Sequence, residues 1–279
     1  MAHIIPALLG QRRTAAKIYK LAVTAWRSVV DIEAIADQER TSISYAEKFF
    51  MEEKEMEGMF KIDTIILESI ITKKGRILDA AMGPGRHVKY FAERGFEVWG
   101  NDFNAHMIEA ARKYVGRGKA RFTNHDMRNL SSIKSGYFDY VLCMGASIGS
   151  VYRRVEREKA MNEFARVVKK GGYVFIHAHN FFELTELGYA ISILAAIKNR
   201  LLRPDKFELG DVVYCHSNSF NKAYMHWFMP DELRNLMRRA GLRVEREFYL
   251  KGPDQDEVLK SSFLKYFRSG GFIFVGRKR

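Results

Sequence analysis

Three acidic residues, Asp79, Asp102 and Asp126, recur at nearly even spacing, and each closes a short, largely apolar segment. The spacing is close to one strand–helix repeat of a parallel α/β sheet, which takes about 25 to 30 residues. Adjacent parallel strands end at one edge of the sheet, where open α/β sheets bind their ligands. The pattern therefore predicts a crevice in which Asp102 suits a ribose diol and Asp126 suits an exocyclic amine.

A glycine turn lies directly beside the first of these acids. The apolar run ends in Asp79 and turns through Ala81, Gly83 and Gly85 before a helix-like segment. Glycine has no Cβ, so the backbone of such a turn can approach a nucleotide-like ligand closely. Val88 stands where a dinucleotide-binding turn would have its third glycine. The adjacent acid suits a cationic or amine-bearing ligand better than a phosphate.

The turn and its surroundings resemble motif I of the class I S-adenosylmethionine-dependent methyltransferases. The segments that resemble this family in order are the glycine turn, Val98–Ala110, Phe138–Met144 and Phe164–Gly172. The resemblance covers roughly residues 75 to 180, and 228 to 249 more loosely. Many members have glycine at the position of Ala81, whereas the glycine N-methyltransferase-like small-molecule group also has alanine there. The chain is therefore closest in motif to that group.

The resemblance implies a Rossmann-like α/β fold, with a mostly parallel seven-stranded sheet, an antiparallel last strand and helices on both faces. The expected parts are an N-terminal helical cap (1–60), a methyltransferase core (61–180 and 230–279) and an inserted lid or substrate-binding segment (181–229). Within the insertion, the apolar run at 187–197 predicts a helix, and the alternating pattern at 212–227 predicts a hairpin.

S-adenosyl-L-methionine is the cofactor that the resemblance implies. The residues expected to bind it are Asp79, Ala81, Gly83, Gly85, Asp102, Phe103, Met107, Asp126, Met127 and Met144. Asp126 is expected to accept a hydrogen bond from the adenine amine, with Phe103 and Met127 as apolar walls.

The acceptor is expected beyond the fourth and fifth strands. Methyl transfer from a sulfonium mainly requires positioning and a dry site, and an amine acceptor has only to arrive neutral. Ser147 and His179 are the candidate catalytic residues, and His177 and Asn180 are candidate substrate-binding residues. His179 could equally be a structural histidine. Tyr45 of the cap could touch the substrate, or could simply pack against the sheet.

The composition is that of an ordinary globular protein, with 47% hydrophobic and 28% charged residues, and the net charge is +13. Residues 1–30 contain basic but no acidic residues, with apolar residues at helical spacing. This segment predicts a basic amphipathic helix, which either covers the domain or contacts an anionic surface, as a peripheral membrane helix or against nucleic acid. Elsewhere the basic residues are dispersed, which argues against a nucleic-acid partner.

No apolar stretch is long enough to cross a membrane, and Lys17 and Lys20 interrupt the early apolar run, so a cytoplasmic enzyme is expected. The chain has two cysteines, Cys143 and Cys215, which do not make a disulfide scaffold. Cys143 is expected to be a buried, inert thiol in the fourth strand. No metal site is expected, because no set of ligands has metal-binding spacing.

These observations predict a methyltransferase that acts on a small-molecule acceptor, with an amine nitrogen as the expected target. One alternative is a methyltransferase for a lipid or other amphiphile at a membrane surface. Another is a non-catalytic, cofactor-binding partner subunit. The sequence does not identify the acceptor or the oligomeric state.

Overall fold

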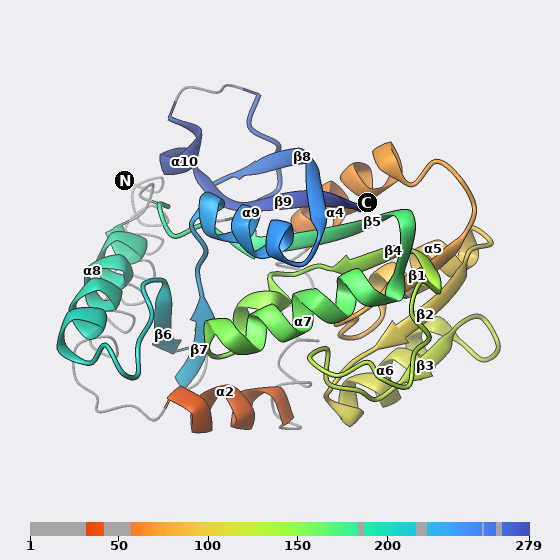
Figure 1. The fold of residues 1–279 in the computed structure, drawn as a ribbon, viewed down its shortest axis with the longest axis horizontal. Helices are drawn as coiled ribbons and strands as arrows, with labels where there is room; N and C mark the ends of the chain where they lie inside the picture. Colours follow the sequence, from red (N-terminus) through yellow and green to blue (C-terminus); the bar gives the residue numbers. More distant parts are fainter. Residues whose placement is uncertain (1–31, 42–56, 184–186, 216–221, 253, 261–263) are drawn as a thin grey trace, which may run out of the picture.

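The computed structural model describes residues 32–41, 57–183, 187–215, 222–252, 254–260 and 264–279 (Figure 1). The basic segment at 1–30 and Tyr45 lie outside the described residues. The predictions made for them are therefore neither confirmed nor contradicted.

The core of the chain is a seven-stranded sheet with the order β3-β2-β1-β4-β5-β9-β8. Its strands are β1 (Arg76–Asp79), β2 (Glu97–Asn101), β3 (Arg121–Thr123), β4 (Phe138–Cys143), β5 (Val168–His179), β8 (Leu242–Lys251) and β9 (Ser269–Lys278). The first five strands are parallel, and β9 runs antiparallel to both β5 and β8. The predicted fold is confirmed, and the strand order reverses at β1 and β4, where such sheets bind ligands.

Helices cover both faces of this sheet. They are α4 (Glu57–Ile70), α5 (Arg86–Glu93), α6 (Ala105–Val115), α7 (Arg154–Val167) and α9 (Pro230–Arg239), and a short helix, α10 (Lys265–Arg268), directly precedes β9. Apolar residues of α7 and α9 pack on one face of the sheet, and those of α4, α5 and α6 form a second buried cluster with its other face (Figure 1). The ligand-binding edge of the sheet is thus built between two packed layers.

Local sequence explains where the helices next to this edge begin. Gly85 has φ 88° and directly precedes α5. A Cβ at this position would lie 3.1 Å from Cβ of Ala111, so the glycine also allows α5 to pack against α6. The side chain of Asn104 caps α6 by accepting a hydrogen bond from the amide of His106. Both helices therefore start at the edge where β1 and β2 end.

The segment at 181–229 contains α8 (Leu187–Leu202) and an antiparallel hairpin of β6 (Asp211–Cys215) and β7 (Lys222–His226). The predicted helix and hairpin are therefore present. Helix α2 (Ile32–Thr41) packs against this hairpin, with Ile32 and Tyr224 in one buried cluster. The division into cap, core and lid remains a prediction.

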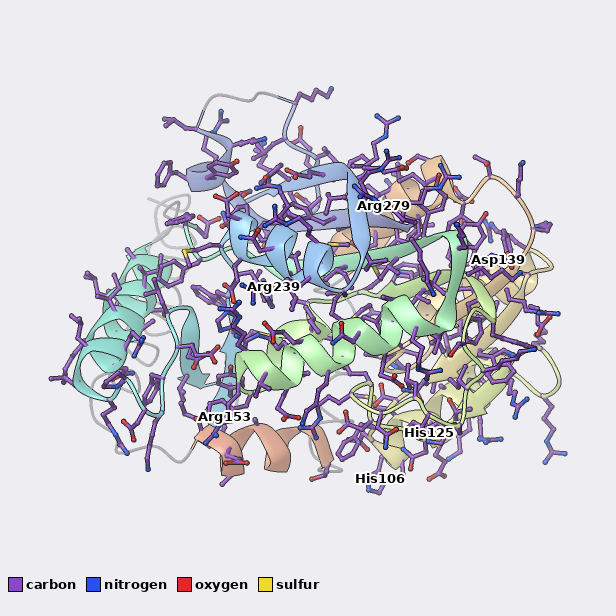
Figure 2. All side chains as sticks on the ribbon, viewed as in Figure 1. His106, His125, Asp139, Arg153, Arg239 and Arg279 are labelled. Atoms are coloured by element: carbon purple, nitrogen blue, oxygen red, sulfur yellow. The ribbon has the colours of Figure 1, made fainter. Side chains whose placement is uncertain are left out.

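Other features of the described residues bear on the expectations from sequence. Cys143 is fully buried, and burial raises the pKa of its thiol, as expected of an inert cysteine. None of the helices in the described part of the chain has the length and apolar character needed to span a membrane. Of the labelled side chains, Arg239 lies on α9, whereas Arg153 directly precedes α7 and Arg279 directly follows β9 (Figure 2).

Candidate functional site

The carboxyl ends of β1 and β2 bring two carboxylates to one place, Asp79 buried and Asp102 partly buried. Asp102 accepts hydrogen bonds of 2.9 Å from the amides of Gly83 and Asn104. Burial nevertheless raises the pKa of Asp102 to about 6, against the effect of these amides. Neither carboxylate oxygen of Asp79 has a hydrogen-bond partner. Burial, followed by the charge of Asp102, raises the pKa of Asp79 to about 8, although the amide of Ala81 works in the opposite direction.

A cavity opens at these strand ends. It is lined by Met59, Phe60, Asp63, Ala81, Met82, Gly83, Pro84, Arg86, His87, Asp102, Met107, Met144, Gly145, Ser147, Ser150 and Met225. Six of the residues predicted from sequence are among them: Ala81, Gly83, Asp102, Met107, Met144 and Ser147. Ser147 begins the short 3₁₀ helix η1 (Ser147–Ser150), and its hydroxyl donates a 2.9 Å hydrogen bond to the carbonyl of Met144. The structure thus gathers residues from the predicted donor and acceptor sides around one cavity.

Other predicted cofactor residues lie outside this lining. Strand β3 ends at Thr123, so Asp126 sits in the following loop. Its carboxylate accepts hydrogen bonds from the backbone amide and the guanidinium of Arg128. Phe103 is 39% exposed, and Met127 packs at the margin of the core on the α7–α9 face. The predicted adenine contacts of these residues stay predictions.

The histidines of β5 are connected to each other behind the cavity. Nε2 of His177 lies 2.7 Å from Oε1 of Gln255, whose Nε2 lies 3.0 Å from Nδ1 of His179. Burial and neighbouring His177 lower the pKa of His179 to about 4, so His179 is neutral at pH 7. The side-chain amide of Asn180 donates hydrogen bonds to the backbone carbonyl and to the hydroxyl of Ser269. The roles predicted for these residues toward a substrate are not tested by this geometry.

Sequence reasoning missed Asp63 and His87, two buried side chains in the cavity wall. Oδ2 of Asp63 lies 4.0 Å from Nε2 of His87, and Oδ1 lies 3.6 Å from Nδ1 of His177. Burial lowers the pKa of His87 to about 4, although Asp63 opposes this. The signal that could have found Asp63 is its position on the apolar face of α4, next to buried Ile66 and Leu67. Burying an acid on the apolar face of a helix is costly unless it has a partner, so its position there is informative.

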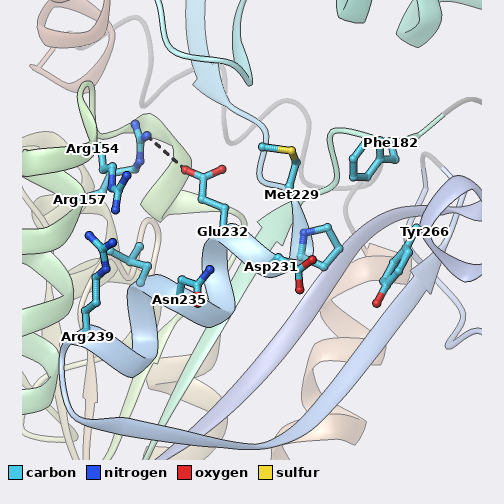
Figure 3. A pocket seen from close by; sticks show the side chains of 11 residues that line it. Arg154, Arg157, Phe182, Met229, Asp231, Glu232, Asn235, Arg239 and Tyr266 are labelled. Atoms are coloured by element: carbon cyan, nitrogen blue, oxygen red, sulfur yellow. Dashed lines mark ion pairs between the residues drawn. The ribbon is translucent and has the colours of Figure 1, made fainter.

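A second and larger cavity, of about 470 Å³, lies between α7, α9 and the residues around Phe182 and Tyr266 (Figure 3). The guanidinium of Arg157 is buried at its edge, 3.6 Å from Oε1 of Glu232 and also paired with Glu208. None of the residues predicted from the glycine turn or the strand ends lines it. We therefore place the candidate active site at the smaller cavity, where the sheet reverses.

Glu208, Asp211 and His226 come close enough together to hold a metal ion. The protein already supplies partners for all three. Asp211 accepts hydrogen bonds of 2.8 Å from the hydroxyl of Tyr224 and from His226. Glu208 pairs with the buried guanidinium of Arg157. This cluster therefore joins the hairpin to α7 and α9 through charges that the chain itself neutralises.

Comparison with known proteins identifies the chain's relatives. A family model described as a methyltransferase domain matches residues 77–172. The glycine/sarcosine/dimethylglycine N-methyltransferase of Actinopolyspora halophila is 26% identical over 200 residues, which are 68% of this chain and 34% of that protein. The glycine/sarcosine N-methyltransferase of Parasynechococcus marenigrum is 32% identical over 117 residues, 41% of this chain and 42% of that protein. The chain thus spans less than half the length of these curated relatives.

A solved structure gives an independent comparison of the fold. The S-adenosylmethionine-dependent methyltransferase from Methanosarcina mazei superposes with a TM-score of 0.62 at 21% sequence identity, covering 76% of this chain and 96% of that one. At this identity the likeness shows the fold.

Proposed function

Because the chain is a class I S-adenosylmethionine-dependent methyltransferase by its domain match and its fold, we propose that it methylates the nitrogen of a small-molecule amine. The observation that carries the proposal is the pair of carboxylates beside the glycine turn. Asp79 is buried with no hydrogen bond to either oxygen and lies 4.0 Å from Nδ1 of His87, and Asp102 is partly buried. The choice of nitrogen follows the relatives described as N-methyltransferases of glycine and sarcosine.

The residues at the strand ends fit S-adenosylmethionine. Asp79 has two buried oxygens without hydrogen bonds, which suit the ammonium of the cofactor's amino-acid part. Asp102 suits the ribose hydroxyls while it holds the turn through Gly83. When bound, S-adenosylmethionine supplies an activated methyl group on a sulfonium. The methionine side chains in the cavity wall, Met107 and Met144 among them, provide the dry surroundings that favour displacement at such a centre.

The raised pKa of Asp79 predicts that cofactor binding strengthens with pH. Asp79 must be ionised to pair with an ammonium, and its pKa is about 8. In the unliganded protein, the stability contributed by the raised pKa is complete below the unfolded value, about 3.9. It is lost as pH rises through the folded value, when an unpaired charge is buried. We expect the increase in Tm caused by S-adenosylhomocysteine to grow from about pH 6 to about pH 8.

Asp79→Asn provides the matched control for this pH series. Asparagine keeps the shape of the side chain but does not titrate, so the thermal shift of the variant should be small and similar at each pH. A wild-type shift that stays constant across the series would show that Asp79 does not pair with the ligand's ammonium.

The proposed acceptor class is tested by a turnover panel. The purified protein is incubated with S-adenosylmethionine and glycine, sarcosine, phenethylamine or vesicles that contain an aminophospholipid. S-adenosylhomocysteine formation is followed, and the product is located by mass spectrometry. Methylation of a soluble amine at nitrogen is the expected result. Binding of S-adenosylhomocysteine without turnover of any acceptor would instead favour the partner-subunit alternative.

The vesicle arm represents the second candidate, an amphiphilic acceptor. One observation favours it: α8 exposes apolar side chains, with Leu194 61% and Leu201 75% exposed. Lys198 and Arg200 lie on the same helix, and such a combination is typical of interfacial helices. Turnover confined to the vesicle arm would replace the small-amine proposal with this candidate.

A further inference from the structure

Asp63 is the buried carboxylate of the cavity that comes from a helix rather than from a strand end. It lies on α4, is 1% exposed and lines the cavity. Among the described residues, the basic side chains within 4.0 Å of its carboxylate are two histidines, His87 and His177. Resting on the amine methylation proposed above, we infer that Asp63 binds the acceptor nitrogen and selects amines that carry no carboxylate.

The geometry leaves Asp63 available to a ligand. Its separations from His87 and His177, 4.0 Å and 3.6 Å, are too long for hydrogen bonds. Its Oδ1, Nε2 of His87 and Nδ1 of His177 are buried atoms without hydrogen-bond partners. Buried polar atoms are normally paired. A carboxylate oxygen and two histidine nitrogens that lack hydrogen bonds in one place therefore indicate a polar ligand at this wall.

The charges that face Asp63 support an amine as that ligand. His87 of α5 is neutral at pH 7, because burial lowers its pKa to about 4. Burial also opposes the charged form of His177 on β5, but Asp63 and the hydrogen bond that Nε2 of His177 donates to Oε1 of Gln255 raise its pKa overall. His177 and His87 thus flank the Asp63 carboxylate, and neutral His87 can accept a hydrogen bond from an amine N–H.

Methyl transfer increases the need for this carboxylate. The lone pair of the neutral amine forms the new N–C bond while the electrons of the broken C–S bond remain on sulfur. Positive charge therefore moves from sulfur to nitrogen, and no proton has to be transferred in the same step. The carboxylate of Asp63 stabilises the charge that develops on nitrogen, and this interaction is stronger in the transition state than in the ground state.

The other residues that line the cavity favour an acceptor that carries no carboxylate. The charged side chains among the described lining residues are Asp63, Asp102 and Arg86. The other walls are largely apolar, with Phe60, Met59, Met82 and Met225 among them. An amino acid would bring a second carboxylate into a cavity whose charges are mainly acidic, and like charges disfavour one another.

Phenethylamine and phenylalanine test this inference, because they differ by one carboxylate. Turnover of both is measured in the wild type, in Asp63→Asn and in Glu57→Gln, a similar change at an exposed carboxylate of the same helix. We expect phenethylamine to have the higher kcat/KM in the wild type. Asp63→Asn should lower it by about 10- to 100-fold, and Glu57→Gln should leave it unchanged. The Kd of S-adenosylhomocysteine should change by less than about twofold in both variants.

Each other outcome has a defined meaning. Preference for phenylalanine, or an Asp63→Asn variant as active as the wild type, overturns the inference but leaves amine methylation standing. A parallel loss of S-adenosylhomocysteine affinity in Asp63→Asn also overturns it, by assigning Asp63 to the donor side or to folding. The inference is also overturned when the wild-type protein neither binds nor methylates phenethylamine or phenylalanine. The proposed function itself fails only when the whole amine panel is inert.

Discussion

Replacing Arg157 with alanine is expected to lower the free energy of unfolding by about 3 kcal/mol, because it removes the guanidinium from a largely buried charge cluster. The Arg157 side chain is 1% exposed and pairs with Glu208 and Glu232. Its guanidinium also donates a hydrogen bond to the carbonyl of Val151. The partner carboxylates are 37% and 23% exposed, so water can partly replace the lost contacts. The expected loss is therefore at the lower end of the range for broken buried pairs.

Arg154→Ala is the matched control for this experiment. Arg154 lies on the same helix, faces the same cavity (Figure 3) and pairs with Glu158, but its side chain is 52% exposed. Exposed ion pairs contribute less than about 1 kcal/mol. Urea unfolding followed by circular dichroism measures both variants. Equal, small losses for Arg157→Ala and Arg154→Ala would show that the cluster does not hold the hairpin to α7 and α9.

Asp102→Ala is expected to weaken binding of S-adenosylhomocysteine by about 1.5 to 3 kcal/mol, or roughly 10- to 150-fold in Kd. Two effects combine. The ribose hydroxyls lose a charged hydrogen-bond acceptor, and the amides of Gly83 and Asn104 lose the carboxylate that holds the turn. Calorimetric titration measures the change.

Two further variants interpret that titration. Asp102→Asn retains one side-chain oxygen and should lose less affinity than Asp102→Ala. Glu109→Ala removes an exposed carboxylate of α6 and should bind like the wild type. An Asp102→Ala protein that binds with unchanged Kd would leave Asp102 with a purely structural role in the turn.

Local sequence was enough to propose the donor half of the site, because its candidate residues follow one another in the chain. The strand before Asp79, the turn through Gly83 and the helix after Gly85 each have their own apolar period or special backbone requirement. The parallel sheet then places Asp102 beside this turn by register, since Asp79 pairs with Gly100. The structure places a cavity at this edge, and the cofactor-binding roles of these residues stay predictions.

The residues that local sequence did not reveal come from distant segments. Met225 reaches the cavity from β7, and Gln255 joins two histidines of β5 from the loop after β8. Neither position has a periodicity or a spacing that marks it. Asp126 shows a different difficulty: the spacing of acids was right for a strand end, but β3 is short, and Arg128 two residues later binds the carboxylate.

Gly149 lies where the loop after β4 meets the inserted hairpin, and both of these segments contribute residues to the cavity. It belongs to η1, which also carries Ser147, and a Cβ at this position would lie 2.6 Å from the carbonyl oxygen of His226 in β7. Backbone is therefore packed on backbone between the loop after β4 and the inserted hairpin. A larger residue at 149 requires a compensating shift of the hairpin, and hence of Met225 in the cavity wall. Positions in η1 and β7 should covary among homologous chains, whereas the turn at β1 can remain constant while the acceptor changes.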